Sequence, residues 1–194
     1  MARNTPPKVK PRALLVLALV AVAGFACDQI SKALVVSAMT EGQTVRVLND
    51  VLQLHFLRNP GAAFSFATGL TWVFSLVAAG VVVFIVCFAR RIRSARWALV
   101  FGLLLGGVLG NLTDRLVRAP GFGLGHVVDF VYTPWLMPAI YNVADICIVV
   151  SMGLFMLLTL RGVGLDGRRT PADDSVADAS APSSAPTDTP LTPH

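Results

Sequence analysis

The sequence predicts an all-α membrane protein, a bundle of four transmembrane helices with a small extracytoplasmic antiparallel β-sheet. Three observations lead to this class. The 194 residues are 55% hydrophobic and only 14% charged, which is too apolar for an ordinary soluble domain of this length. The apolar residues are collected in four long runs, and most basic residues lie just outside those runs.

The four apolar runs predict helices at about 13–36, 70–89, 97–112 and 143–160. The second run has 20 residues. A helix of that length extends about 30 Å, which is the thickness of the hydrocarbon core of a bilayer. The runs are joined by short or patterned segments, so we place residues 1–161 in one membrane domain.

The segment between the first two runs, about 44–66, predicts the strands of the sheet. β-branched and aromatic residues alternate there with polar ones, as in a half-buried strand. Asn49-Asp50 and Asn59-Pro60-Gly61 supply turns. Residues 162–194 are mostly Asp, Ala, Ser, Thr and Pro, so we expect a disordered cytoplasmic tail.

The formal net charge of +5 is placed in a way that indicates topology. Eleven of the sixteen basic residues fall at the N-terminus, between the second and third runs, and directly after the fourth run. By the positive-inside rule, both termini are predicted to be cytoplasmic and the two longer loops to face outward. We therefore expect no nucleic-acid partner.

The three cysteines, Cys27, Cys87 and Cys147, lie in or beside apolar runs without the paired spacing of metal ligands. We expect no metal and no other cofactor. Basic residues and an apolar stretch precede Cys27, as in a secretory signal, so an alternative is a lipoprotein or binding module anchored there. Three more apolar runs follow, so this segment is interpreted as a retained first helix.

Polar residues gather at one end of the predicted helices and in the loops on that side. They form five groups: Asp28-Gln29 with Lys32; Asn59-Pro60-Gly61-Ala62-Ala63-Phe64; Asn111 with Asp114-Arg115; Val127-Val128-Asp129-Phe130; and Asn142 with Asp145. Charged groups near hydrocarbon are costly and are retained mainly for function. Their common depth therefore indicates a functional layer.

Two acids in this layer have a cation nearby in the sequence. Asp28 precedes Lys32 by four residues, the spacing at which a helix brings two side chains together. Asp114 is followed by Arg115. Both acids are interpreted as members of structural ion pairs, although the second cluster could equally line a substrate site.

Asp129 and Asp145 have no such partner, and they are the candidate catalytic pair. When two carboxyl groups share a site, one holds a proton while the other can act as a base on water. Asp129 could also be a solvated loop acid, but its apolar neighbours argue against free exposure. Asp145 precedes a long apolar run, where a structural role is harder to justify.

The ordered motifs resemble those of lipoprotein signal peptidase, also called signal peptidase II, over about residues 12–161. They are Asp28-Gln29-x-x-Lys32, Asn59-x-Gly61-Ala62-Ala63-Phe64, Gly107-x-x-x-Asn111-x-x-Asp114-Arg115, Val127-Val128-Asp129-Phe130 and Asn142-x-Ala144-Asp145. One motif is weak evidence; five in order are specific. The resemblance implies that Asp129 and Asp145 are catalytic. It implies supporting or substrate-binding roles for Asp28, Lys32, Asn59, Gly61, Asn111, Asp114, Arg115 and Asn142.

The resemblance further implies an aspartic endopeptidase that removes signal peptides from bacterial prolipoproteins. Cleavage would occur on the amino side of a cysteine that carries a diacylglyceryl group. The implied partners are these prolipoproteins and membrane lipids, with no cofactor, and we expect a monomer. The implied location is the bacterial cytoplasmic (inner) membrane, with the active site near the outer leaflet.

The main alternative is a small transporter or channel, in which intramembrane acids carry protons or bind cations. Such a protein is expected to place polar residues at several depths, often where helices are broken near the midplane. The midsections of all four runs are apolar here, and the acids lie at one end. This distribution favours the peptidase.

Overall fold

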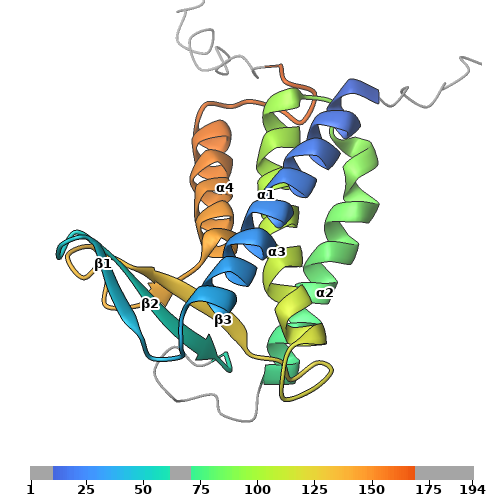
Figure 1. Ribbon diagram of the computed structural model, residues 1–194. Coiled ribbons are helices and arrows are strands. Elements are labelled where there is room, and N and C mark those ends of the chain that lie inside the picture. Colours follow the sequence, from blue (N-terminus) through green and yellow to red (C-terminus); the bar gives the residue numbers. More distant parts are fainter. Residues whose placement is uncertain (1–10, 62–70, 169–194) are drawn as a thin grey trace, which may run out of the picture.

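The computed structural model describes residues 11–61 and 71–168, which form a helical bundle with a sheet across one end (Figure 1). The elements in chain order are α1 (Pro11–Ala38), β1 (Thr44–Leu48), β2 (Leu52–Asn59), α2 (Thr71–Phe88), η1 (Ala89–Arg91), α3 (Ala95–Val117), β3 (Val127–Tyr132), β4 (Ile140–Tyr141) and α4 (Val143–Leu160).

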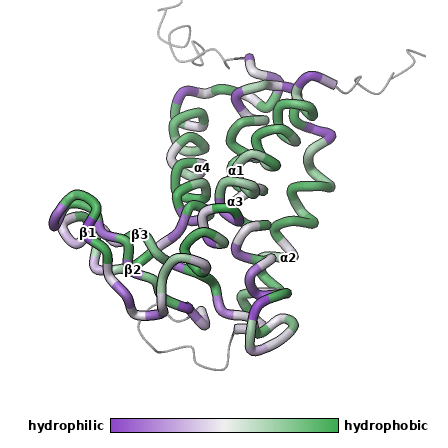
Figure 2. Tube along the Cα trace, in the orientation of Figure 1, coloured by the Kyte–Doolittle hydropathy of each residue, from purple (hydrophilic) through white to green (hydrophobic). Residues whose placement is uncertain are grey.

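In the described part of the chain, α1, α2, α3 and α4 are long and apolar enough to span a membrane, which confirms the four predicted helices. Figure 2 shows apolar residues along the helices and polar residues concentrated at their ends and in the loops. α3 continues to Val117, past the predicted end at residue 112. Its last turns remain helical because their polar side chains have buried partners.

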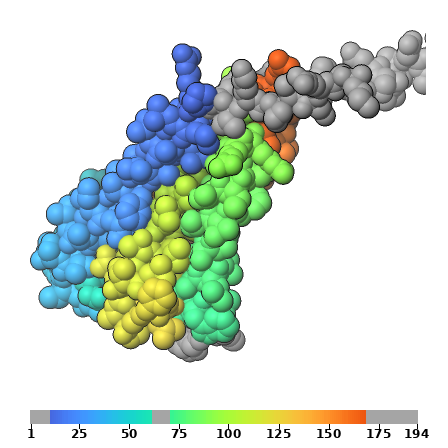
Figure 3. Space-filling view, turned by 90° about the vertical axis from the view of Figure 1, so that its right-hand side faces the viewer, coloured from blue at the N-terminus to red at the C-terminus, as the bar shows by residue number. Residues whose placement is uncertain are grey.

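α3 is the central helix, and its glycines let α1 and α4 approach closely. A Cβ atom at Gly106 would lie 2.7 Å from the carbonyl oxygen of Ala21 in α1. One at Gly107 would lie 2.5 Å from the carbonyl oxygen of Ala144 in α4. Small residues at these positions therefore allow close packing of the helices. Figure 3 shows α1 and α2 on either side of α3.

The four strands form one antiparallel sheet in the order β1-β2-β3-β4. β1 and β2 confirm the predicted hairpin, and Asn49 makes its turn with φ +48°. The strand expected at 62–66 lies outside the described residues. β3 and β4 were not predicted as strands. β3 is buried at four consecutive positions and is apolar on both sides of Asp129, so it lacks the alternating pattern by which strands are recognised.

The sheet packs against the helix ends through a small apolar core of its own. Phe56 of β2 and Val128 and Phe130 of β3 are buried with Val35 of α1, and Val143 at the start of α4 packs against them. This end of the bundle lies opposite the two ends of the described chain (Figure 1). The core brings β3 and the start of α4 together.

Residues 162–168, which we call the strap, fall in the segment expected to be a disordered tail. They are instead packed on the start of α3. The indole N–H of Trp97 donates to the carbonyl oxygen of buried Val163 at 3.0 Å. The backbone N–H groups of Arg93 and Ser94 both donate to the carbonyl oxygen of Leu165 at 3.1 Å. The remainder of the expected tail, 169–194, lies outside the described residues.

Candidate active site

The predicted polar residues converge in a buried layer between the sheet and the adjoining ends of α1, α3 and α4. Asp28, Lys32, Asp114 and Asn142 are completely buried, and Asp129 is 2% exposed. Buried polar groups on this scale must satisfy one another, because unpaired charges without water are strongly destabilising. The layer divides into a charged part and a neutral part.

The charged part consists of Asp28, Lys32 and Asp114, which we call the brace. The ammonium of Lys32 lies 2.8 Å from a carboxylate oxygen of each aspartate. The predicted pair between Asp28 and Lys32 is confirmed. The predicted pair between Asp114 and Arg115 is wrong: the partners of Asp114 are Lys32 and Arg118, whose Nε lies 2.6 Å away. Adjacent residues on a helix point in different directions, whereas Arg118 lies one turn further on the same face.

The brace also holds the backbone beside each candidate catalytic acid. Asp28 accepts a 2.9 Å hydrogen bond from the N–H of Ala144, the residue before the α4 candidate. Asp114 accepts a 3.2 Å hydrogen bond from the N–H of Val128, the residue before the β3 candidate. The same ion-paired cluster therefore fixes both segments that carry the candidate acids.

Asp145 is held at the start of α4 by a reciprocal cap with Asn142. The Asn142 side chain accepts from the N–H of Asp145 at 3.0 Å, and Asp145 accepts from the N–H of Asn142 at 3.1 Å. This capping box explains the three-residue spacing in the motif. Asn111 of α3 donates a third hydrogen bond to Asp145, at 2.8 Å.

Asp129 lies on β3 rather than in the loop where the sequence suggested it. Asn59 of β2 donates to one carboxyl oxygen at 2.8 Å, and Asn142 donates to the other at 2.6 Å. Asn142 thus bonds to both candidate acids and joins them in one site. The pKa of Asp129 is raised to about 6, chiefly by burial and also by the nearby charge of Asp145, although the two amide hydrogen bonds and the charge of Lys32 lower it.

The orientation of the Asn111 amide is set by the brace. Its oxygen accepts from the ammonium of Lys32 at 3.0 Å and from the amide of Asn142 at 3.1 Å. Its nitrogen is therefore the atom that faces Asp145. A neutral amide stands between the buried cation and this acid.

Arg115 lies on the side of the candidate acids rather than with Asp114. Its Nη1 donates to the carbonyl oxygen of Asn111 at 3.3 Å, and its guanidinium lies 5.8 Å from the ring centre of Phe74 in α2. It interacts electrostatically with Asp129 and Asp145 and, to a smaller extent, with Asp114. Its buried Nε has no hydrogen-bond partner in the part of the chain that the structure describes.

Gly61 lies next to Asn59 and Phe74, beside the candidate acids. Its φ of +106° lies in the region that favours glycine, and its N–H donates to the side chain of Asn59 at 2.9 Å. A Cβ atom there would lie 2.8 Å from the ring of Phe74. Gly61 therefore helps to place both the amide that binds Asp129 and the ring beneath Arg115. Ala62, Ala63 and Phe64 of the same motif lie outside the described residues.

An apolar cavity of about 270 Å³ opens beside Asp145. Leu136 and Met137 of the β3–β4 connection and Tyr141 of β4 line one side, and Ile146 with its neighbours on α4 lines the other. An acid at the edge of an apolar cavity can meet the polar bond of a substrate whose remaining parts are apolar.

Two contributors to the layer were not among the predicted site residues. Gln29 donates to Asp28 at 3.0 Å and to the carbonyl oxygen of Gly110 at 3.1 Å. Arg118 follows Asp114 by four residues, so the helical spacing that identified Lys32 could have found it. In the described ranges, no group of three or more His, Cys, Asp or Glu side chains is placed to hold a metal ion.

Comparisons with known proteins agree on one family. A family model described as signal peptidase (SPase) II matches residues 20–161. The lipoprotein signal peptidase of Leifsonia xyli subsp. xyli is 63% identical over 162 residues, covering 84% of this chain and 74% of that protein. That of Rhodococcus jostii is 47% identical over 167 residues, covering 86% and 83%.

The fold is also shared with solved structures. A bacterial membrane enzyme structure determined by the in meso method matches with a TM-score of 0.65 and 23% sequence identity, covering 84% of this chain and 95% of that one. A second such structure matches with a TM-score of 0.64 and 24% identity, covering 78% and 94%.

Proposed function

We propose that this chain, which belongs to the signal peptidase II family, is an aspartic endopeptidase with Asp129 and Asp145 as its dyad. Members of this family are membrane proteases that remove signal peptides from prolipoproteins. The observation that carries the proposal is the position of Asn142, which donates to Asp129 and caps α4 together with Asp145. Two carboxyl groups are thereby held in one site among neutral amides.

The two acids have different surroundings, which assigns them different roles. Asp129 is buried, and its raised pKa of about 6 favours retention of a proton. Asp145 accepts hydrogen bonds from Asn142 and Asn111 in the first turn of a helix, where negative charge is stabilised. Asp145 therefore acts as the base and Asp129 as the acid.

In the proposed reaction, Asp145 takes a proton from a water molecule whose oxygen attacks the carbonyl carbon of the scissile peptide bond. Asp129 donates its proton to the carbonyl oxygen, which gives a neutral tetrahedral diol. The C–N bond then breaks as Asp145 returns its proton to the leaving amine and Asp129 recovers a proton from the diol. The products are a carboxylic acid and the new amino terminus, and the dyad regains its starting protonation.

Arg115 supplies the positive charge in this scheme. It interacts with both dyad acids, and its unpartnered Nε, among the described residues, is a donor for the substrate carbonyl. Such a donor stabilises charge that develops on the carbonyl oxygen before proton transfer is complete.

The substrate is proposed to be a prolipoprotein whose cysteine carries a diacylglyceryl group, cut on the amino side of that cysteine. The apolar cavity beside Asp145 supports this choice, because it offers acyl chains a surface next to the base. Outward-facing α4 residues such as Val149, which is 69% exposed, extend this surface toward the lipid.

The orientation in the membrane is proposed from charge. Arginines collect at the end of the bundle opposite the sheet, so that end and both termini are cytoplasmic, and the sheet is extracytoplasmic. The dyad then lies near the outer leaflet of the bacterial cytoplasmic membrane. The protein is proposed to act as a monomer.

The test is to incubate the purified protein with a precursor peptide, with and without the diacylglyceryl group on its cysteine. We expect cleavage of the modified peptide alone, with the lipidated cysteine as the new amino terminus, identified by mass spectrometry. Equal cleavage of the two peptides would contradict the substrate assignment.

A further inference from the structure

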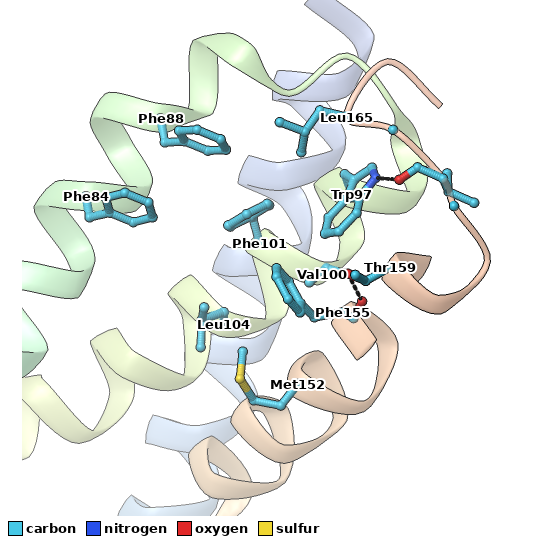
Figure 4. Close-up of a pocket in the computed structure, with 13 residues that line it drawn as sticks. Phe84, Phe88, Trp97, Val100, Phe101, Leu104, Met152, Phe155, Thr159 and Leu165 are labelled. Atoms are coloured by element: carbon cyan, nitrogen blue, oxygen red, sulfur yellow. Dashed lines mark hydrogen bonds between the residues drawn. The ribbon is translucent and has the colours of Figure 1, made fainter. Parts of the chain in front are cut away.

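A second and larger cavity lies at the end of the bundle away from the dyad. Its volume is about 610 Å³. Figure 4 shows that Phe84 and Phe88 of α2 and Met152 and Phe155 of α4 surround it, with Phe101 of α3 between them. The lining is almost entirely apolar, so the cavity suits a hydrocarbon chain.

The strap forms one wall of this cavity. Val163 and Leu165 line it, and the strap is held to α3 by the hydrogen bond from Trp97 to Val163. The match to the family model ends at residue 161, so the strap lies beyond it. The cavity is therefore built partly from a segment outside the match that identifies the peptidase.

The two outer helices that line the cavity also carry exposed apolar side chains, which face lipid in a membrane-spanning bundle. Val83 and Val86 of α2 are 61% and 58% exposed, and Met156 of α4 is 63% exposed. A hydrocarbon chain can enter between these helices without crossing water. Filling the cavity would remove the apolar lining from any water and restore dispersion contacts across it.

The end of the bundle where the cavity lies is strongly basic. The described segments 89–97 and 160–168 contain six arginines and one acid, Asp166. The guanidinium of Arg91 lies 5.7 Å from the ring centre of Phe88, which lines the cavity, and exposed Arg161 directly precedes the strap. Arginines at this end serve topology in any case, but Arg91 and Arg161 also adjoin Phe88 and Gly162, which line the cavity.

The charge decides between two possible occupants. A signal peptide has an apolar segment, but it also carries basic residues at its N-terminal end, which the arginines would repel. A phospholipid with a negatively charged headgroup complements both features. We propose that this cavity binds one anionic phospholipid, with an acyl chain between α2 and α4 and its phosphate on Arg91 and Arg161.

Trp97 provides a reporter, because its indole lines the cavity. In a Trp72→Phe, Trp135→Phe background it is the single tryptophan of the chain. The protein is reconstituted in phosphatidylcholine bilayers that contain the same mole fraction of either phosphatidylglycerol or phosphatidylcholine with brominated chains. We expect stronger quenching by the brominated phosphatidylglycerol, with each arginine contributing about fivefold to the lipid preference.

The matched variants are Arg91→Gln with Arg161→Gln, and Arg46→Gln as the control, because Arg46 is exposed on β1 at the other end of the molecule. The double variant should lower quenching by phosphatidylglycerol to the phosphatidylcholine level, and the control should not. Equal quenching by the two lipids, or an unchanged preference in the double variant, would overturn the proposal. Displacement of the lipid by an equimolar basic signal peptide would also overturn it. Neither measurement requires peptidase activity.

Discussion

The brace and the dyad are both pairs of buried aspartates, but they are neutralised in opposite ways. Asp28 and Asp114 share the ammonium of Lys32 at 2.8 Å each. Asp129 is bound by the neutral amides of Asn59 and Asn142. A buried cation compensates the negative charge of the carboxylates beside it, whereas neutral amides donate hydrogen bonds without supplying an opposite charge.

This difference has a consequence for stability. The pKa of Asp129 rises from 3.8 to about 6 because of burial, so the folded protein binds this proton more tightly than the unfolded chain does. Asp129 therefore costs no stability below about pH 4, and its ionisation destabilises the fold as pH rises toward about 6. Removing a partner from the brace would leave a buried charge unpaired, whereas the buried acid of the dyad is itself maintained at the expense of stability.

The largest expected effect on stability follows from removing the cation of the brace. Lys32→Met leaves two buried carboxylates without their shared partner, and breaking such a cluster costs about 3–5 kcal/mol. We expect little folded protein, measured by thermal unfolding in detergent. The matched control is Arg58→Met, which breaks the exposed pair with Glu41 and should cost at most about 1 kcal/mol. Similar unfolding temperatures for the two variants would contradict the structural role of the brace.

The next effect comes from the close approach of α1 to α3 at the brace. A Cβ atom at Gly110 would collide with the carboxylate of Asp28. Gly110→Ala should lower stability by roughly 1–3 kcal/mol. Gly80→Ala on α2 is the control, since nothing lies within 4 Å of a Cβ atom there. It should be neutral or slightly stabilising, as alanine favours helix. If both variants unfold alike, the predicted packing at the brace is wrong.

Substitutions at Arg115 and Arg118 test the dyad and the brace separately. Arg115 faces the dyad and Arg118 bonds to Asp114 of the brace. Arg115→Lys should lower kcat/KM by about 10²-fold with little change in unfolding temperature. Arg118→Lys should lower the unfolding temperature with a smaller effect on kcat/KM. The reverse pattern, measured by peptide cleavage and thermal unfolding, would exchange their assignments.

The smallest expected effect is a shift in the pH dependence of kcat/KM. If Asp129 must hold a proton, kcat/KM should decline as pH rises above about 6. Asn59→Ala removes a hydrogen bond that lowers the pKa of Asp129, so the declining limb should move to higher pH. Gln53→Ala on the same strand leaves Asp129 untouched and should not move it. A shift to lower pH in Asn59→Ala would show that Asp129 does not act as the acid.

Local sequence patterns predicted much of this molecule. Apolar run length located four helices, and the spacing between Asp28 and Lys32 predicted their ion pair. The partners of Asp114 were missed because Lys32 comes from another helix and because adjacency in sequence was given more weight than helical spacing.

Other parts required three-dimensional information. β3 was missed because a strand buried on consecutive positions has no alternation. The link between the two dyad acids runs through one side chain, Asn142, whose reach depends on how β3 and α4 pack. The strap was missed because a short polar segment can still be ordered by two apolar side chains and backbone hydrogen bonds to a neighbouring helix.

The central claim is that Asp129 and Asp145, and not the brace acids, carry the chemistry. The most direct measurement is the rate at which purified Asp129→Asn and Asp145→Asn cut the diacylglyceryl-modified precursor peptide, with each variant shown to be folded. We expect each rate to fall by about 10⁴-fold or more, while the unfolding temperature stays at or above that of the unsubstituted protein. Full activity in either folded variant would contradict the dyad.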